Sequence, residues 1–212
     1  MPCRIGFIGA GGTGKTSVLE LLKPFLEEQN IKVRPSVVRG VLKDLNLTEK
    51  DLSTLSLEQG EEVQRHLFFA KEAQDRAVVL SGENFITDRT LLDHYVYWLY
   101  RGGKAIRKEN LENFLLGVSE SLSTYSKLFY FPVYATWEPP DDGFREEGYI
   151  YRKTIDFLMS GVAGTIVTRN YKLAAKISTV PDTPPSQRKV WMEGILRNQG
   201  MGQPHFMEEG VL

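Results

Sequence analysis

Apolar residues along the chain gather in short runs that alternate with longer amphipathic stretches. The short runs are bounded by glycine, proline or charged residues, which is typical of strands buried in a parallel sheet. We expect such strands at Cys3–Ile8, Lys32–Val38, Asn84–Thr87 and Lys127–Phe131. The pattern is ambiguous over residues 160–180, where Thr165–Thr168 and Ala174–Val180 could each be a strand.

The amphipathic stretches predict helices between these strands. Thr16–Gln29 has an apolar face, and Pro24 within it should kink or shorten the helix. Ser56 is suited to cap a long helix that ends near Leu80. The aromatic-rich helix Thr90–Tyr100 is compatible with a core position or with a homodimer face. The other expected helices are Val41–Lys50, Leu111–Ser123, one that starts near Tyr149, and a last one that ends near Asn198.

Alternation of strands and helices indicates an α/β fold in which helices cover both faces of a parallel sheet. The chain shows no internal repeat and no linker that would divide it. We therefore expect a single domain over residues 1–198. The glycine-rich end, residues 199–212, is expected to be a frayed tail.

Composition narrows the class of protein. With 212 residues the chain can bury a full core, and its 42% hydrophobic and 25% charged residues are ordinary for a soluble globular protein. A net charge of −1 does not indicate nucleic acid as a partner, although a local basic groove is compatible with it. The single cysteine, Cys3, excludes an internal disulfide, and no apolar run is long enough for a membrane span. We expect a cytoplasmic protein.

The sequence after the first strand is a complete phosphate-binding motif. Gly9–Thr16, GAGGTGKT, matches G-x-x-x-x-G-K-[ST] between an apolar strand and an amphipathic helix. Its glycines let backbone N–H groups converge on phosphate oxygens, Lys15 adds a positive charge, and Thr16 offers a hydroxyl to Mg²⁺. ATP and Mg²⁺ are therefore the expected cofactors. The predicted nucleotide-binding residues are Gly9, Gly11, Gly12, Thr13, Gly14, Lys15, Thr16 and Ser17.

A phosphate loop does not by itself separate kinases from other nucleotide-binding proteins. A GTPase would carry D-x-x-G and N-K-x-D, and neither occurs in the chain. A ring-forming ATPase would carry Asp-Glu at the end of a strand, whereas Asp88 is followed by Arg89.

Asp88 and Arg89 follow the strand Asn84–Thr87 at its carboxyl end, where ligands bind in open α/β sheets. A carboxylate here can hold Mg²⁺ or accept a proton from an attacking hydroxyl. An arginine can bind a phosphate or sugar oxygen of a substrate. The alternative is a surface ion pair, but the phosphate loop favours the functional interpretation.

The segment DRTLLDHYVYW, Asp88–Trp98, resembles the D-R-x-x-x-D-x-x-x-Y segment of P-loop nucleoside and nucleotide kinases. It is most similar to their ribosylnicotinamide-kinase-like AAA-domain subgroup and more distantly similar to thymidylate kinases. The resemblance implies a three-layer sandwich around a five-stranded parallel sheet in the order 2-3-1-4-5. It also implies that Asp88 is the base or a magnesium-side acid, and that Arg89 contacts substrate. Asp93 falls on the second acid, which either binds substrate or supports Arg89.

Two further arginines are candidates by the same resemblance. The loop around residues 137–153 contains Asp142-Gly143-Phe144-Arg145, which is similar to a short acid-Gly-x-Arg lid in this subgroup. Such a lid excludes water and brings a positive charge, so Arg145 is a candidate catalytic residue, against the alternative of a solvated charged loop. Arg39 follows the second strand, where similar kinases bind substrate through Glu-x-x-Arg. Position 36 is Ser36 and not glutamate, so the acceptor cannot be transferred from the family.

Three functions remain open from the sequence. The first is a kinase that phosphorylates a nucleoside, a nucleotide or a related small molecule near Asp88. The second is a kinase that phosphorylates 5-hydroxymethyluracil in DNA, as similar P-loop kinases of phages are thought to do. The third is an ATPase that is not a kinase.

Overall fold

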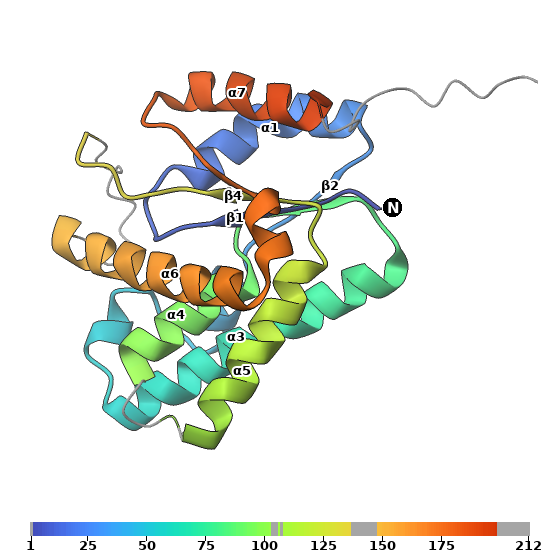
Figure 1. Cartoon of the computed structure of the whole chain (residues 1–212). Coiled ribbons are helices and arrows are strands. Elements are labelled where there is room, and N and C mark those ends of the chain that lie inside the picture. Colours follow the sequence, from blue (N-terminus) through green and yellow to red (C-terminus); the bar gives the residue numbers. More distant parts are fainter. Residues whose placement is uncertain (1, 103–105, 107, 137–147, 199–212) are drawn as a thin grey trace, which may run out of the picture.

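The computed structural model describes residues 2–102, 106, 108–136 and 148–198. Within them, five parallel strands form one sheet in the order β2-β3-β1-β4-β5 (Figure 1). This order confirms the fold that the resemblance implies. The strands are β1 (Arg4–Ile8), β2 (Lys32–Arg34), β3 (Phe85–Thr87), β4 (Lys127–Tyr130) and β5 (Ile177–Thr179).

Helices cover both faces of the sheet, so the fold has three layers (Figure 1). The two helices on one face are α1 (Lys15–Glu28) and α7 (Pro185–Asn198). The helices on the other face are α3 (Leu57–Ser81), α4 (Leu91–Gly102), α5 (Lys108–Ser123) and α6 (Tyr149–Arg169). The remaining short elements are α2 (Val38–Asp44) and the 3₁₀ helices η1 (Asp51–Ser53) and η2 (Tyr171–Lys176).

The continuous apolar pattern of β1 follows from its central position. Ile5 and Phe7 pack toward α1 and α7, whereas Ile8 packs toward the helices on the opposite face. Gly6 faces the start of α4, where an added Cβ would lie 2.7 Å from Thr90 Cγ2. The missing side chain therefore lets the segment after β3 approach β1, which brings Asp88 and Arg89 close to the phosphate loop.

The sequence pattern located most elements correctly, and the errors have local causes. Thr165–Thr168 lies within α6, so the prediction of a strand there is wrong. Its residues are β-branched, but the helix buries an apolar face that includes Ile155, Met159 and Ile166, and this burial favours helix over strand. The last strand is β5, which lies inside Ala174–Val180.

The bounds of the second strand and of the helix after it differ from the expectation, and that helix ends at Asp44 instead of Lys50. The second strand ends at Arg34, just before Pro35, and the following helix starts at Val38 instead of Val41. The proline in α1 does not shorten that helix, which continues to Glu28.

Two predictions about helices are resolved by the structure. Ser56 caps α3 in a capping box with Gln59, as the sequence predicts. The aromatic helix α4 is part of the core, because Tyr95, Val96 and Trp98 are at most 2% exposed. Within the described residues, no helix combines the length and apolar character needed to cross a membrane. Most of the predicted lid, with Arg145, and the predicted tail lie outside the described residues.

Candidate active site

The phosphate loop, residues 9–16, connects β1 to α1 and lines a pocket together with Asp88 and Arg89. Gly9 has a φ of 154°, and an added Cβ there would lie 2.5 Å from the carbonyl oxygen of Phe131. Gly14 caps α1 in the left-handed conformation, with a φ of 87°. Both positions favour glycine, so the motif's glycines are required by the path of the backbone.

Side chains within the loop and on α7 hold its shape. The Lys15 ammonium is buried and donates to the carbonyl oxygens of Gly9 at 2.6 Å and Ala10 at 2.7 Å. The Thr13 hydroxyl donates to the Ala10 carbonyl at 3.0 Å, and the Arg188 guanidinium donates to the Thr13 carbonyl at 2.9 Å. These bonds hold a positive charge within the curve of the loop, where phosphate oxygens would bind.

Helix α4 supports the same loop through two residues one turn apart. The Gly9 N–H donates to Asp93 Oδ1 at 3.0 Å, and the Gly11 N–H donates to the Tyr97 hydroxyl at 2.9 Å. The second oxygen of Asp93 accepts hydrogen bonds from the N–H and the hydroxyl of Thr90, at 2.9 and 3.0 Å. Asp93 is fully buried, and this burial raises the pKa of its carboxyl group although Lys15 and Arg89 oppose the shift.

The position of Asp93 bears on the two roles that the sequence left open. Both carboxylate oxygens bond to the protein, so the geometry favours a supporting role over direct contact with a substrate. Its hydrogen bonds go to the phosphate loop and to Thr90, whereas its interaction with Arg89 is electrostatic. Tyr97, the tyrosine of the D-R-x-x-x-D-x-x-x-Y segment, received no role from the sequence. Its spacing of four residues from Asp93 places both side chains on one face of the helix.

Asp88 meets the phosphate loop directly. The Thr16 hydroxyl donates to Asp88 Oδ2 at 2.7 Å. Asp88 Oδ1 is buried and has no hydrogen-bond partner among the residues that the structure describes. An unsatisfied carboxylate oxygen beside a hydroxyl fits Mg²⁺, which prefers oxygen ligands. The described residues contain no group of three acidic, histidine or cysteine side chains that could hold a metal. A magnesium ion here would therefore need phosphate oxygens and water as its other ligands.

Arg89 lies between the phosphate loop and a second pocket, and lines both. Its guanidinium lies 5.1 Å from the centre of the Tyr97 ring, and its Nη2 atom lies 3.8 Å from Glu49 Oε1. Glu49 comes from the loop between α2 and η1, where no sequence motif singled it out. Arg89 thus places a guanidinium, a group that binds phosphate and carboxylate oxygens, at the boundary between the two pockets.

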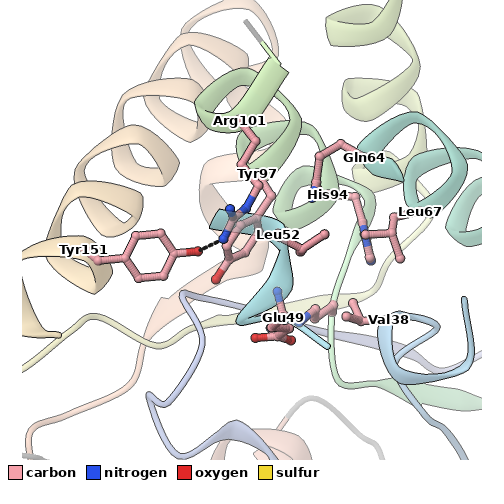
Figure 2. Close-up of a pocket in the computed structure, with 10 residues that line it drawn as sticks. Val38, Glu49, Leu52, Gln64, Leu67, His94, Tyr97, Arg101 and Tyr151 are labelled. Carbon is pink, nitrogen blue, oxygen red and sulfur yellow. Dashed lines mark hydrogen bonds and ion pairs between the residues drawn. The ribbon is translucent and has the colours of Figure 1, made fainter. Parts of the chain in front are cut away.

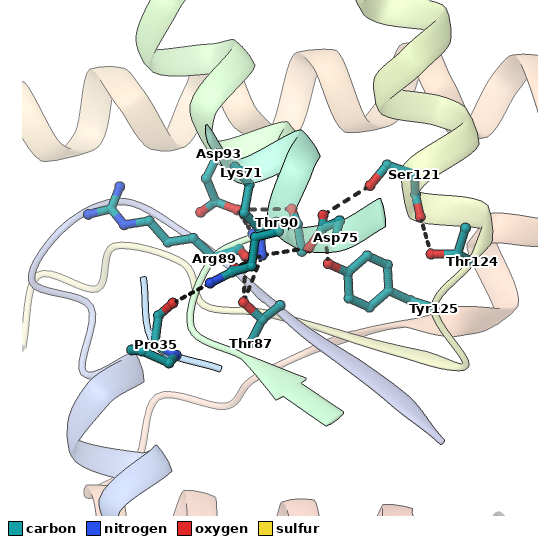
Figure 3. Close-up of polar contacts among 11 residues, drawn as sticks. Pro35, Lys71, Asp75, Thr87, Arg89, Thr90, Asp93, Ser121, Thr124 and Tyr125 are labelled. Atoms are coloured by element: carbon teal, nitrogen blue, oxygen red, sulfur yellow. Dashed lines mark hydrogen bonds and ion pairs between the residues drawn. The ribbon is translucent and has the colours of Figure 1, made fainter. Parts of the chain in front are cut away.

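A buried lysine fixes the backbone that carries Asp88 and Arg89 (Figure 3). Lys71 on α3 is 1% exposed, and its ammonium bonds to Asp75 at 2.7 Å and to the Thr87 hydroxyl at 2.9 Å. The Thr87 hydroxyl in turn donates to the Arg89 carbonyl at 3.1 Å. Burial lowers the pKa of Lys71, and the nearby Asp75 opposes this shift. The lysine therefore joins the long helix α3 to the end of β3.

The other two predicted site residues are Arg39 and Arg145. Arg39 is exposed on α2 and lines neither of the two pockets. Arg145 lies outside the described residues. Lys153, the last residue of the predicted lid, lies on α6 and bonds to the Val133 carbonyl at 3.1 Å and to Asp156 at 2.7 Å. The substrate-binding role of Arg39 and the catalytic role of Arg145 stay predictions.

Together, the parallel sheet, the phosphate loop and the Asp88-Arg89 strand end define a protein of the P-loop kinase fold. A family model described as AAA domain matches residues 4–171, most of the chain, and the chain belongs to this family. Among curated proteins, no sequence relative was found.

Solved structures have the same fold at low sequence identity. Deoxyadenosine kinase from M. mycoides, with products dCMP and dCDP, has a TM-score of 0.65 and 12% identity, covering 92% of this chain and 99% of that one. The NadR protein in complex with NR has a TM-score of 0.64 and 13% identity, covering 94% of this chain and 52% of that one. NadR in complex with NAD and AMP-PNP has a TM-score of 0.60 and 10% identity, and the coverages are 95% and 50%. The chain thus spans about half the length of the NadR chains.

Proposed function

We propose that the chain is a kinase that transfers the γ-phosphate of ATP to a hydroxyl of a nucleoside, a nucleotide or a related small molecule. The observation that carries the proposal is the 2.7 Å hydrogen bond between Thr16 and Asp88. It joins the phosphate loop to a strand end that offers a carboxylate oxygen without a hydrogen-bond partner among the described residues and, one residue later, an arginine. The molecules bound in the similar structures, AMP-PNP in NadR and dCMP in deoxyadenosine kinase, support the same chemistry.

Each residue of the site has a role in this reaction. The N–H groups of the loop and the Lys15 ammonium bind the phosphates of ATP. Thr16 and Asp88 provide the oxygens for Mg²⁺, which neutralises phosphate charge when bound. Asp88 is also placed to accept the proton of the attacking hydroxyl, and Arg89 orients the acceptor. The rate then comes chiefly from in-line placement and charge neutralisation.

A transfer assay with radiolabelled ATP tests the proposal. The acceptors are a panel of nucleosides and nucleotides and, in a separate arm, a duplex that contains 5-hydroxymethyluracil. Label in a small molecule is the expected result. Label in the duplex would support the DNA-base kinase instead, and release of phosphate alone would overturn the kinase proposal and leave an ATPase.

The matched variants are Lys15→Ala and Lys23→Ala. Lys15 is buried in the phosphate loop, whereas Lys23 is exposed on the same helix and pairs only with Glu20 among the described residues. The first variant is expected to abolish transfer and the second to preserve it. Equal transfer by both variants would show that the measured activity does not come from this site.

A further inference from the structure

A third pocket, of about 500 Å³, lies where α3, α4 and α5 meet, on the face of the sheet opposite α1 and α7 (Figure 1). We call it the outer pocket. Its volume is typical of sites that hold a small organic molecule. Its lining includes Glu61, Arg65 and Phe69 of α3, Trp98 of α4, and Asn110 and Phe114 of α5.

The outer pocket is separate from the second pocket beside Arg89. None of its described lining residues also lines that pocket. Figure 2 shows His94, Tyr97 and Arg101 in the second pocket, and their spacing of three and four residues places them on one face of α4. Trp98 follows Tyr97 and lies on another face, at the outer pocket. The outer pocket is therefore a site of its own.

Aromatic rings form one wall of the outer pocket. The ring centres of Trp98 and Phe114 lie 4.5 Å apart, and those of Phe69 and Phe114 lie 6.1 Å apart. Phe69 is 42% exposed, so part of this cluster is open to a ligand. Aromatic side chains bind planar rings by stacking and by edge contacts. The wall therefore favours a flat aromatic ligand.

Polar groups in the same pocket suit the edge of such a ring. Trp98 is 2% exposed, and its Nε1 atom is buried without a hydrogen-bond partner among the described residues. An indole N–H can only donate, and burying it unpaired is costly. Arg65 adds further donors, and Glu61 adds a carboxylate that accepts. A ring that accepts from Trp98 and Arg65 and donates to Glu61 satisfies all three groups.

Helix α4 connects the outer pocket to the phosphate loop. The same helix carries Asp93 and Tyr97, which accept hydrogen bonds from the N–H groups of Gly9 and Gly11. Because Trp98 directly follows Tyr97, a small shift of α4 at the outer pocket also moves the Tyr97 hydroxyl relative to the loop. A ligand that binds Trp98 can therefore change how the loop holds phosphates.

We propose that the outer pocket binds a planar amino-oxo heterocycle, the ring edge that guanine and pterins share, and that its occupancy alters the affinity of the phosphate loop for nucleotide. The N–H and amino groups of this edge donate to Glu61, and its oxygen accepts from Arg65 or Trp98. The flat ring contacts Phe69 and Phe114. The inference goes beyond the proposed function, because it requires neither phosphate transfer nor a particular acceptor.

Nuclear magnetic resonance of the indole N–H groups tests the pocket. The chain has three tryptophans, and Trp191 on α7, on the opposite face of the sheet, is the internal control. Trp98→Phe and Trp191→Phe assign the two signals. The probes are guanosine and pterin, and adenosine, which lacks the amino-oxo edge, is the matched control. We expect guanosine or pterin to shift the Trp98 signal and leave that of Trp191 in place, and the two arms identify which compound fits.

Matched variants locate the binding site. Glu61→Gln removes the charge that accepts from the ring, so the dissociation constant of the bound probe is expected to rise about ten-fold or more, and Arg65→Ala should have a similar effect. Glu62→Gln is the control, because Glu62 is exposed beside Glu61 and does not line the outer pocket. This variant should bind the probe at least as tightly as wild type. Adenosine should bind about ten-fold more weakly than the probe.

Calorimetric titration with AMP-PNP, with and without the saturating probe, tests the connection through α4. We expect the probe to change the dissociation constant of AMP-PNP about five-fold or more, and Glu61→Gln to remove this effect. An effect that persists in Glu61→Gln would come from another site and would overturn the assignment. A shifted Trp98 signal with unchanged AMP-PNP affinity would support the pocket and overturn the connection. If neither guanosine nor pterin shifts the Trp98 signal at millimolar concentration, the inference is wrong, whatever the result of the transfer assay.

Discussion

Replacing Asp93 by asparagine distinguishes support of the phosphate loop from direct contact with substrate. Asp93 accepts one hydrogen bond from Gly9 and two from Thr90, all between 2.9 and 3.0 Å. Asparagine keeps one acceptor oxygen and presents an NH₂ group in place of the other. If its oxygen faces the two donors of Thr90, its NH₂ group faces the N–H of Gly9, and two donors then meet.

The magnitude follows from the bonds that are lost. A hydrogen bond to a charged group contributes about 1.5–3 kcal/mol, and a buried donor left unpaired costs about 1–3 kcal/mol. Burial raises the pKa of Asp93, so removing its charge recovers part of the cost of desolvation. We therefore expect a net loss of about 2 kcal/mol, a shift of about 4–8 °C in the unfolding midpoint for a chain of this size. Affinity for AMP-PNP should fall roughly ten-fold, because the Gly9 amide is no longer held.

Urea unfolding and calorimetric titration with AMP-PNP measure these two quantities. Asp44→Asn, an exposed substitution in α2, is the control and should change stability by less than about 0.5 kcal/mol. The reasoning is refuted if Asp93→Asn unfolds at the wild-type midpoint, binds AMP-PNP normally and loses only the acceptor. In that case Asp93 contacts substrate, which is the other role that the sequence allows.

Three other predictions concern single side chains. Asp88→Asn should lower phosphate transfer about a hundred-fold or more, measured with radiolabelled ATP, and near-normal turnover would remove Asp88 from the role of base. Lys71→Met leaves the Asp75 carboxylate without its cation and should lower the free energy of unfolding by about 3 kcal/mol. The control, Arg76→Ala on the exposed side of α3, should change this free energy by less than about 0.5 kcal/mol. Equal urea midpoints for the two variants would contradict the prediction. Because the pKa of His94 is depressed in the folded state, its contribution to stability is complete above the unfolded value of about 6.5 and is lost as the pH falls below it. Wild type should therefore lose more stability than His94→Gln between about pH 7.5 and about pH 5.5, measured by urea unfolding, and parallel stability curves for the two proteins would refute the shift.

The phosphate-binding half of the site could be predicted because its signals are local. Gly9–Thr16 is a continuous motif, and the path of the backbone that it requires is set by residues next to one another. Asp88 and Arg89 could be placed near it because the carboxyl ends of parallel strands share one edge of the sheet. The bond between Thr16 and Asp88 agrees with that placement.

The surroundings of Asp88 and Arg89 could not be predicted, because their residues come from elements that no local pattern connects. His94 and Lys71 lie in helices whose sequences indicate only amphipathic packing, and Glu49 lies in a loop without a motif. Arg39 was suggested by its place after β2; it is exposed on α2 and does not line either of the two pockets that Arg89 lines, and its substrate-binding role stays a prediction. Similarly, Thr165–Thr168 has the composition of a strand, but it forms part of a helix because the apolar face of α6 packs against the core.

The sequence by itself therefore determined the alternation of strands and helices, the phosphate loop and the chemical identity of the strand end at Asp88. Each of these depends on the spacing of residues within a few positions. Only the tertiary structure decided that Asp93 and Tyr97 hold the loop and that Lys71 anchors the end of β3. It also decided that His94 is buried, with a ring nitrogen that has no hydrogen-bond partner among the described residues. The reason is that hydrogen bonding and burial depend on groups brought from distant parts of the chain. The Gly9 amide and its acceptor on Asp93 are 84 positions apart.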